Sequence, residues 1–171
     1  MDGIDGLIGA EAVMMGGVLG FFFAFRGAWD LTFIAGALAA SAAGFLVWNW
    51  HPAKVFMGDV GSVLFGFSFG ALAIVAENRG VLPAFFFVLL FALFITDATL
   101  STLRRVVRRE RWFEAHRTFA YQRALLLGYN HGQVVLRAMG MNGVLVAFAF
   151  LALWQPTLLL PLTIVAFVIL S

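Results

Sequence analysis

Long hydrophobic stretches follow one another along the chain, and short polar segments separate them. The stretches are 7–25, 31–50, 60–76, 81–96, 138–154 and 157–171. A helix needs roughly 20 residues to cross a bilayer, and interfacial neighbours can complete the shorter stretches. Pro83 stands where one helix can begin, and Gln155 and Pro156 separate the last two. The pattern predicts an all-α, polytopic integral membrane bundle of about six transmembrane helices.

Composition supports the same class. The chain is 63% hydrophobic and only 12% charged, with a mean hydropathy of +0.97. These values are far too apolar for a soluble domain of 171 residues. The chain has no cysteine, so it forms no disulfide. We therefore treat residues 1–171 as a single membrane domain.

Cationic side chains gather on one side of the predicted bundle. If the amino terminus is cytoplasmic, the inside segments are 1–6, 51–59 and the basic loop 101–136, whereas the outside turns hold only Arg26 and Arg79. The inside cations are Lys54, Arg104, Arg105, Arg108, Arg109, Arg111, Arg117 and Arg123. This asymmetry predicts cytoplasmic loops. The net charge of +2 therefore needs no nucleic acid, since these arginines suit anionic membrane lipid or a phosphorylated substrate.

The polar segment 51–62 lies between two of the hydrophobic stretches. Gly58 and Gly61 flank Asp59, so backbone amides can approach a bound anion, and the carboxylate can hold Mg²⁺ that carries phosphate oxygens. His51 and Lys54 add cationic or donor groups to the same loop. The alternative is that Asp59 caps the helix that begins near residue 60.

Further carboxylates lie near the predicted membrane surfaces. Asp2 and Asp5 are three residues apart and share one side of a turn, which favours either metal binding or capping of the first helix. Glu11 and Asp97 lie close to or within predicted spans, where a carboxylate needs a polar cavity or a partner. These two residues make a transporter an additional hypothesis. Asp30 is expected to cap a helix on the outside.

The cytoplasmic segment 108–123 combines arginines, aromatic residues and one histidine, His116. Arginine forks can bind a nucleotide diphosphate, whereas the alternative is a basic surface helix on anionic lipid. His116 is the more specific candidate because polar residues surround it in the sequence. His131, within Gly-Tyr-Asn-His-Gly, is interpreted as an ordinary turn residue next to the following helix.

Four motifs in this order resemble the bacterial polyprenyl-phosphate N-acetylhexosamine-1-phosphate transferases. They are Met-Asp-Gly-Ile-Asp-Gly at 1–6, His-Pro-Ala-Lys-Val-Phe-Met-Gly-Asp-Val-Gly-Ser at 51–62, Asp-Ala-Thr-Leu-Ser-Thr-Leu-Arg-Arg at 97–105 and Ala-His-Arg-Thr-Phe-Ala-Tyr-Gln-Arg at 115–123. The resemblance implies Mg²⁺-dependent transfer of a sugar 1-phosphate from a UDP-sugar to undecaprenyl phosphate. UMP would be released on the cytoplasmic side of the bacterial inner membrane, and the product would start a cell-envelope polysaccharide such as O-antigen.

The resemblance also assigns roles to individual residues. Asp59 matches the family's catalytic aspartate and metal ligand. Asp2 and Asp5 match paired aspartates near the nucleotide and the metal, so Asp5 is a second expected ligand. His116 matches the first histidine of a loop that binds the substrate pyrophosphate, with His51, Lys54 and Arg117 as further expected substrate-binding residues.

Two departures from the family pattern bear on activity. The chain opens inside a family motif and has none of the upstream helices that carry the family's Asp-Asp pair, so it resembles the carboxy-terminal part of a longer transferase. Phe119 stands in place of the second loop histidine, and Arg117 or Arg123 is expected to serve instead. The alternative function is a non-catalytic membrane fragment or a subunit of a split enzyme. The alternative protein partners are a second copy of the chain or a missing amino-terminal half.

Overall fold

The computed structural model describes residues 4–107, 124 and 127–170 of the chain. Its elements are α1 (Leu7–Phe25), α2 (Trp29–Asn49), α3 (Gly58–Asn78), α4 (Ala84–Leu90), α5 (Ala92–Val107), α7 (His131–Trp154), the short 3₁₀ helix η1 (Pro156–Leu158) and α8 (Leu159–Leu170). The described residues are therefore all-helical in their regular structure, as predicted. The expected basic loop 101–136 includes the end of α5 and the start of α7, and its central part, 108–123, lies outside the described residues.

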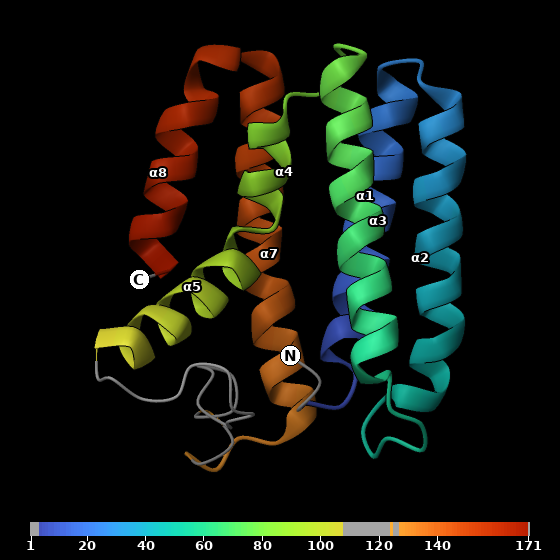
Figure 1. Cartoon of the computed structure of the whole chain (residues 1–171), viewed down its shortest axis with the longest axis vertical. Helices are drawn as coiled ribbons and strands as arrows, with labels where there is room; N and C mark the ends of the chain where they lie inside the picture. The colour runs from blue at the N-terminus through green and yellow to red at the C-terminus, as the bar shows by residue number, and fades with distance from the viewer. Residues whose placement is uncertain (1–3, 108–123, 125–126, 171) are drawn as a thin grey trace.

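The long helices run side by side along the long axis of the molecule (Figure 1). Four of the described helices, α1, α2, α3 and α7, are long and apolar enough to cross a membrane. A fifth span exists if α4 and α5 are counted together, and the final apolar helix, Pro156–Leu170, is shorter. These features confirm a polytopic helical membrane protein.

The predicted span 81–96 is not one straight helix. The chain bends by 75° between α4 and α5, and Figure 1 shows α5 leaning away from the bundle. Neither proline nor glycine occurs between residues 84 and 107, so a helix breaker does not cause the bend. The composition changes instead: α4 is wholly apolar, whereas α5 carries Thr96, Asp97 and Arg104. The bend therefore coincides with the change from the wholly apolar α4 to the mixed composition of α5.

Helix α1 lies at the centre of the amino-terminal half. Over its membrane-length window, 56% of the residues are buried, compared with 17% for α2 and for α3. It packs most extensively against α2, and small residues allow the close approach. A Cβ atom added to Gly16 would lie 2.9 Å from both the carbonyl oxygen of Ala35 and the Cβ atom of Ala39. Glycine at position 16 is therefore required for the packing of α1 on α2.

One buried polar contact joins the two halves of the bundle. Asn142 on α7 donates a side-chain hydrogen bond to Glu11 on α1, and both side chains are buried. The contact supplies the partner that the sequence analysis required for Glu11. Glu11 Oε1 and Asn142 Oδ1 have no hydrogen-bond partner among the described residues. The pair therefore depends on a single hydrogen bond within the apolar interior.

Replacing Asn142 with leucine should lower the stability of the bundle. The change leaves a buried Glu11 carboxyl without its donor, which costs about 1–3 kcal/mol of unfolding free energy. The double variant Glu11→Leu/Asn142→Leu should recover most of that loss, because both polar groups are then gone. Thermal unfolding in detergent, followed by circular dichroism, measures the difference. Equal destabilisation of the single and double variants would contradict the pairing.

The structure corrects one expected helix cap. Asp30 was expected to cap a helix, but Ala28 occupies the N-cap position of α2 and Asp30 lies in the first turn. Its carboxylate accepts a hydrogen bond from Arg79 at the end of α3. The prediction considered only neighbours in sequence, whereas the contact joins residues that the packing of α2 and α3 brings together. Asp30 therefore pairs with a cation on the neighbouring helix.

Candidate active site at one end of the bundle

Three chain segments meet at one end of the bundle: the start of α1, the loop 50–57 and the start of α7. The side chain of Asn49 links the first two. Its Oδ1 accepts a hydrogen bond from the Gly6 backbone N–H at 2.9 Å, and its Nδ2 donates to the Val55 carbonyl at 2.8 Å. Asn49 is buried, so these bonds are shielded from water. They hold the 50–57 loop against the residues that precede α1.

Asp5 is the point of contact among the three segments. Its Oδ2 accepts hydrogen bonds from His51 Nδ1 at 2.8 Å and from the Ala53 backbone N–H at 3.2 Å. Burial raises the pKa of the Asp5 carboxyl, but these hydrogen bonds and the nearby imidazoles outweigh burial and hold that pKa below its ordinary value. Capping was the alternative role for Asp5, yet Gly6 is the N-cap residue of α1 and no side chain caps this helix. The carboxylate of Asp5 is therefore directed to the loop and not to its own helix.

His131 completes this group. Its Nδ1 accepts a hydrogen bond from the Asp5 backbone N–H at 3.0 Å and lies 3.4 Å from Asp5 Oδ1. Its ring stacks on that of His51, with centroids 4.9 Å apart and planes at 16°. One ligand atom from each of Asp5, His51 and His131 lies within 4.8 Å of the others, and the described residues contain no other such group of three potential metal ligands.

The interpretation of His131 as an ordinary turn residue was wrong. It is the first residue of α7, directly after the N-cap Asn130. The side chains of Asn130 and Gln133 form a reciprocal capping box, which is readable in the sequence as Asn-x-x-Gln. That pattern could have placed His131 at a helix start, although its contact with Asp5, 126 residues away, could not be inferred from spacing.

Asp59 lies in the first turn of α3. The N-cap position belongs to Met57 and no side chain caps the helix, so the capping interpretation of Asp59 is wrong. The preceding Gly58 has φ of +65°, a conformation that favours glycine and starts the helix immediately before the aspartate. The side chain of Asp59 is exposed. Its carboxylate therefore lies at the positive end of the helix dipole and is open to a ligand.

The other expected site residues have different positions. Lys54 is exposed on the loop, with its ammonium 5.5 Å from the centroid of the Trp48 ring. Asp2, His116 and Arg117 lie outside the described residues, as do Phe119 and Arg123. The structure thus brings Asp5, His51 and His131 together. Lys54 lies on the loop between α2 and α3, and Asp59 lies in the first turn of α3.

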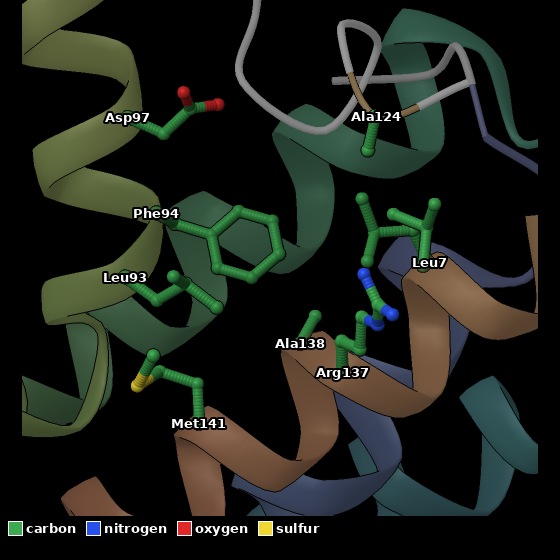
Figure 2. Close-up of a pocket in the computed structure, with 9 residues that line it drawn as sticks. Leu7, Leu93, Phe94, Asp97, Ala124, Arg137, Ala138 and Met141 are labelled. Carbon is green, nitrogen blue, oxygen red and sulfur yellow. The ribbon is translucent and has the colours of Figure 1, made fainter. Parts of the chain in front are cut away.

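A mainly apolar pocket of about 240 Å³ lies between α1, α5 and α7. Figure 2 shows Phe94 and Leu93 on α5 facing Ala138 and Met141 on α7. The wall also includes two charged residues, Asp97 on α5 and Arg137 on α7. The Arg137 guanidinium carbon lies 3.8 Å from the centroid of the Tyr129 ring.

Comparison with known proteins identifies the family. Residues 1–77 match the family model of glycosyl transferase family 4. The phospho-N-acetylmuramoyl-pentapeptide-transferase of Gemmatimonas aurantiaca is 32% identical to the chain over an alignment of 164 residues. The alignment covers 80% of the chain and 41% of that protein. The chain belongs to glycosyl transferase family 4.

Two further curated relatives match the chain. The phospho-N-acetylmuramoyl-pentapeptide-transferase of Moorella thermoacetica is 39% identical over 106 residues, or 62% of the chain and 31% of that protein. The probable undecaprenyl-phosphate N-acetylglucosaminyl 1-phosphate transferase of Bacillus subtilis is 27% identical over 142 residues, or 80% of the chain and 38% of that protein. No solved structure matches the chain. The chain thus spans about a third to two fifths of the length of these relatives.

Proposed function

We propose that this chain forms part of a transferase that moves a sugar 1-phosphate of the N-acetylhexosamine type from a UDP-sugar to undecaprenyl phosphate. The exposed Asp59 carboxylate, in the first turn of α3 and free of a capping role, is the observation that supports the proposal most strongly. Family membership supports the same class of reaction. In this reaction an oxygen of the lipid phosphate attacks the phosphorus attached to the sugar. The bond from that phosphorus to the UMP oxygen breaks, and UMP leaves.

The residues near Asp59 fit a Mg²⁺ ion bound together with substrate. Mg²⁺ prefers oxygen ligands and is commonly held by one or two carboxylates, with water and substrate phosphates completing its shell. Asp59 supplies such a carboxylate, and bound Mg²⁺ would neutralise charge on the diphosphate oxygens. The expectation that Asp5 is a second ligand of this ion stays a prediction.

The remaining candidate residues would bind and orient the two substrates. We assign Lys54, His51, His116 and Arg117 to the diphosphate of the donor, where cationic groups and N–H donors hold phosphate oxygens. Asp2 and Asp5 are assigned to the nucleotide end. Phosphoryl transfer depends mainly on such positioning and charge neutralisation.

The pocket between α1, α5 and α7 suits the lipid acceptor. Its apolar wall can hold the first isoprene units of a polyprenyl chain, and Arg137 offers a cation near the phosphate. The proposal is tested by measuring Mg²⁺-dependent UMP release from a UDP-sugar and undecaprenyl phosphate. The membranes should contain this chain together with family-type amino-terminal helices. An absence of UMP release from correctly assembled protein would contradict the proposed function.

The alternative function is a non-catalytic membrane fragment or one subunit of a split enzyme. This alternative is supported by the fact that the chain matches only 31–41% of the length of its relatives. The structure weakens the transporter hypothesis, which was based on Glu11 and Asp97. Asn142 forms a hydrogen bond with Glu11, so this carboxylate has a structural partner and needs no transported ion to explain it.

Single cysteines should reveal cytoplasmic active-site loops. Asn78, at the end of α3, and Gly132, at the start of α7, lie at opposite ends of the bundle (Figure 1), and the chain has no native cysteine to remove. Cysteine at Gly132 or Thr118 should react with a membrane-impermeant thiol reagent only after the inner membrane is opened, whereas cysteine at Asn78 should react in intact spheroplasts. The reverse labelling pattern would place the loops on the wrong side for a cytoplasmic nucleotide sugar.

A further inference from the structure

The group formed by Asp5, His51 and His131 has the ligand chemistry of a metal site. It offers carboxylate oxygen and two imidazole rings from three separate segments of the chain, and one ligand atom of each residue lies within 4.8 Å of the others. Imidazole nitrogen suits Zn²⁺, Co²⁺ and Ni²⁺, whereas Mg²⁺ selects oxygen ligands. We propose that Asp5, His51 and His131 bind a divalent transition-metal cation with the coordination preferences of Zn²⁺, separately from the Mg²⁺ ion assigned to Asp59. In this proposal the metal site replaces the roles in substrate and Mg²⁺ binding that the family resemblance implies for Asp5 and His51.

The charge of the group favours a cation over an anion. The Asp5 carboxylate lies between the two histidines, 2.8 Å from His51 Nδ1 and 3.4 Å from His131 Nδ1. A phosphate at this position would face that carboxylate at close range and would be repelled. A divalent cation would instead gain one anionic ligand and two neutral nitrogen ligands, the combination used in many zinc sites.

Coordination needs the His51 ring to turn out of its stack on His131, because the nitrogen lone pair of an imidazole lies in the ring plane and the two planes are nearly parallel. The distances are closer to those of a metal site. Zinc bonds to nitrogen and oxygen are about 2.0–2.2 Å, so ligand atoms around one tetrahedral ion lie roughly 3.4 Å apart. The 3.4 Å separation of His131 and Asp5 already has this value. The His51 side chain lies on the 50–57 loop and is 43% exposed, so it can move with little cost. A metal bond to His131 Nδ1 would replace the hydrogen bond that this atom accepts from the Asp5 N–H.

The exposed fractions leave a route for the ion. The Asp5 side chain is 13% exposed, but those of His51 and His131 are 43% and 28% exposed, so the imidazole side of the group opens to solvent. Three protein ligands leave a fourth position of a tetrahedral ion for water or another oxygen ligand. A bound ion would also fasten the start of α1, the 50–57 loop and the start of α7 to one another.

Cobalt titration of the purified 171-residue chain tests the site. Co²⁺ replaces Zn²⁺ with the same ligands and absorbs visible light when coordinated, so binding is read from the spectrum without any transferase step. The protein should carry a histidine-free affinity tag. We expect saturable binding of one Co²⁺ per chain that Zn²⁺ displaces. His131→Gln or His51→Gln should weaken the binding at least ~100-fold, because each removes one ligand of the site.

His116→Gln and Asp59→Asn are the matched controls. His116 is the one histidine of the chain outside the proposed site, and Asp59 carries the carboxylate assigned to Mg²⁺. Both variants should therefore keep the wild-type cobalt spectrum and affinity. Circular dichroism and size-exclusion profiles establish that each variant is folded. An absence of saturable Co²⁺ binding by folded wild-type protein would overturn the proposal, as would equal binding by the folded His131→Gln and His51→Gln variants. Neither result depends on activity, so the proposed transferase function is tested independently.

Discussion

Asp59→Asn, in a protein that also contains the family's remaining helices, should abolish sugar-phosphate transfer and leave the fold intact. The amide has nearly the same size as the carboxylate but lacks the charge that holds Mg²⁺. The loss of several kcal/mol of metal and transition-state stabilisation corresponds to a rate at least ~10³-fold lower. Stability should change little, because Asp59 is exposed and caps no helix.

Asp30→Asn is the matched control for this variant. Asp30 is the second residue of α2 just as Asp59 is the second residue of α3, so the two changes perturb their helix dipoles equally. Asp30 lies at the other end of the bundle and loses only an exposed ion pair with Arg79, which water screens. UMP release should therefore remain near wild type in Asp30→Asn and in the outside-turn variant Arg26→Gln. Near-normal release by folded Asp59→Asn would refute the catalytic assignment.

Hydrophobic pattern predicted the helical class because the length of an apolar run is a direct consequence of membrane thickness. All six predicted stretches are wholly or mainly helical in the described residues. The pattern did not predict the bend between α4 and α5, because the residues on both sides of Phe91 are apolar and no proline or glycine occurs there. Helix α5 contacts α7 and α8, so its direction depends on packing in the assembled bundle, which the hydrophobic pattern does not contain.

The candidate site was predictable only where its residues are close in sequence. Glycines next to Asp59 drew attention to the polar segment 51–62, and the structure has Asp59 exposed in the first turn of α3. The contact of Asp5 with His51 spans 46 positions and that with His131 spans 126, so both depend on helix packing. His131 was consequently missed as a member of the group. Spacing also misassigned Asp30, whose partner is on another helix.

Expressed alone, residues 1–171 should insert into the membrane but show no detectable transfer from UDP-sugars to undecaprenyl phosphate. The chain spans at most 41% of the relatives described above, and the family resemblance implies an acidic pair on helices that residues 1–171 do not include. Asp59 supplies one carboxylate for Mg²⁺, whereas activation of the lipid phosphate would need further groups. Glu11 is an unsuitable substitute because it is buried and hydrogen-bonded to Asn142.

Buried polar side chains of the described bundle find partners within the chain. Asn142 contacts Glu11, for which the sequence required a partner, and the Gly6 and Val55 backbone groups contact Asn49. These contacts within the chain favour its stable insertion by itself. Inactivity of the isolated chain would therefore reflect absent catalytic groups more than misfolding.

Co-expression with a family-type amino-terminal half that ends just before Met1 should restore Mg²⁺-dependent UMP release. The same co-expression with the Asp59→Asn chain should not restore UMP release. This control distinguishes an active site assembled from both halves from transfer by the added half alone. Large apolar side chains on α2 and α3, among them Phe33, Val47 and Phe67, are exposed and can face lipid or the added helices. Robust turnover by the purified 171-residue chain alone would refute this prediction and show that the described bundle is a self-sufficient transferase.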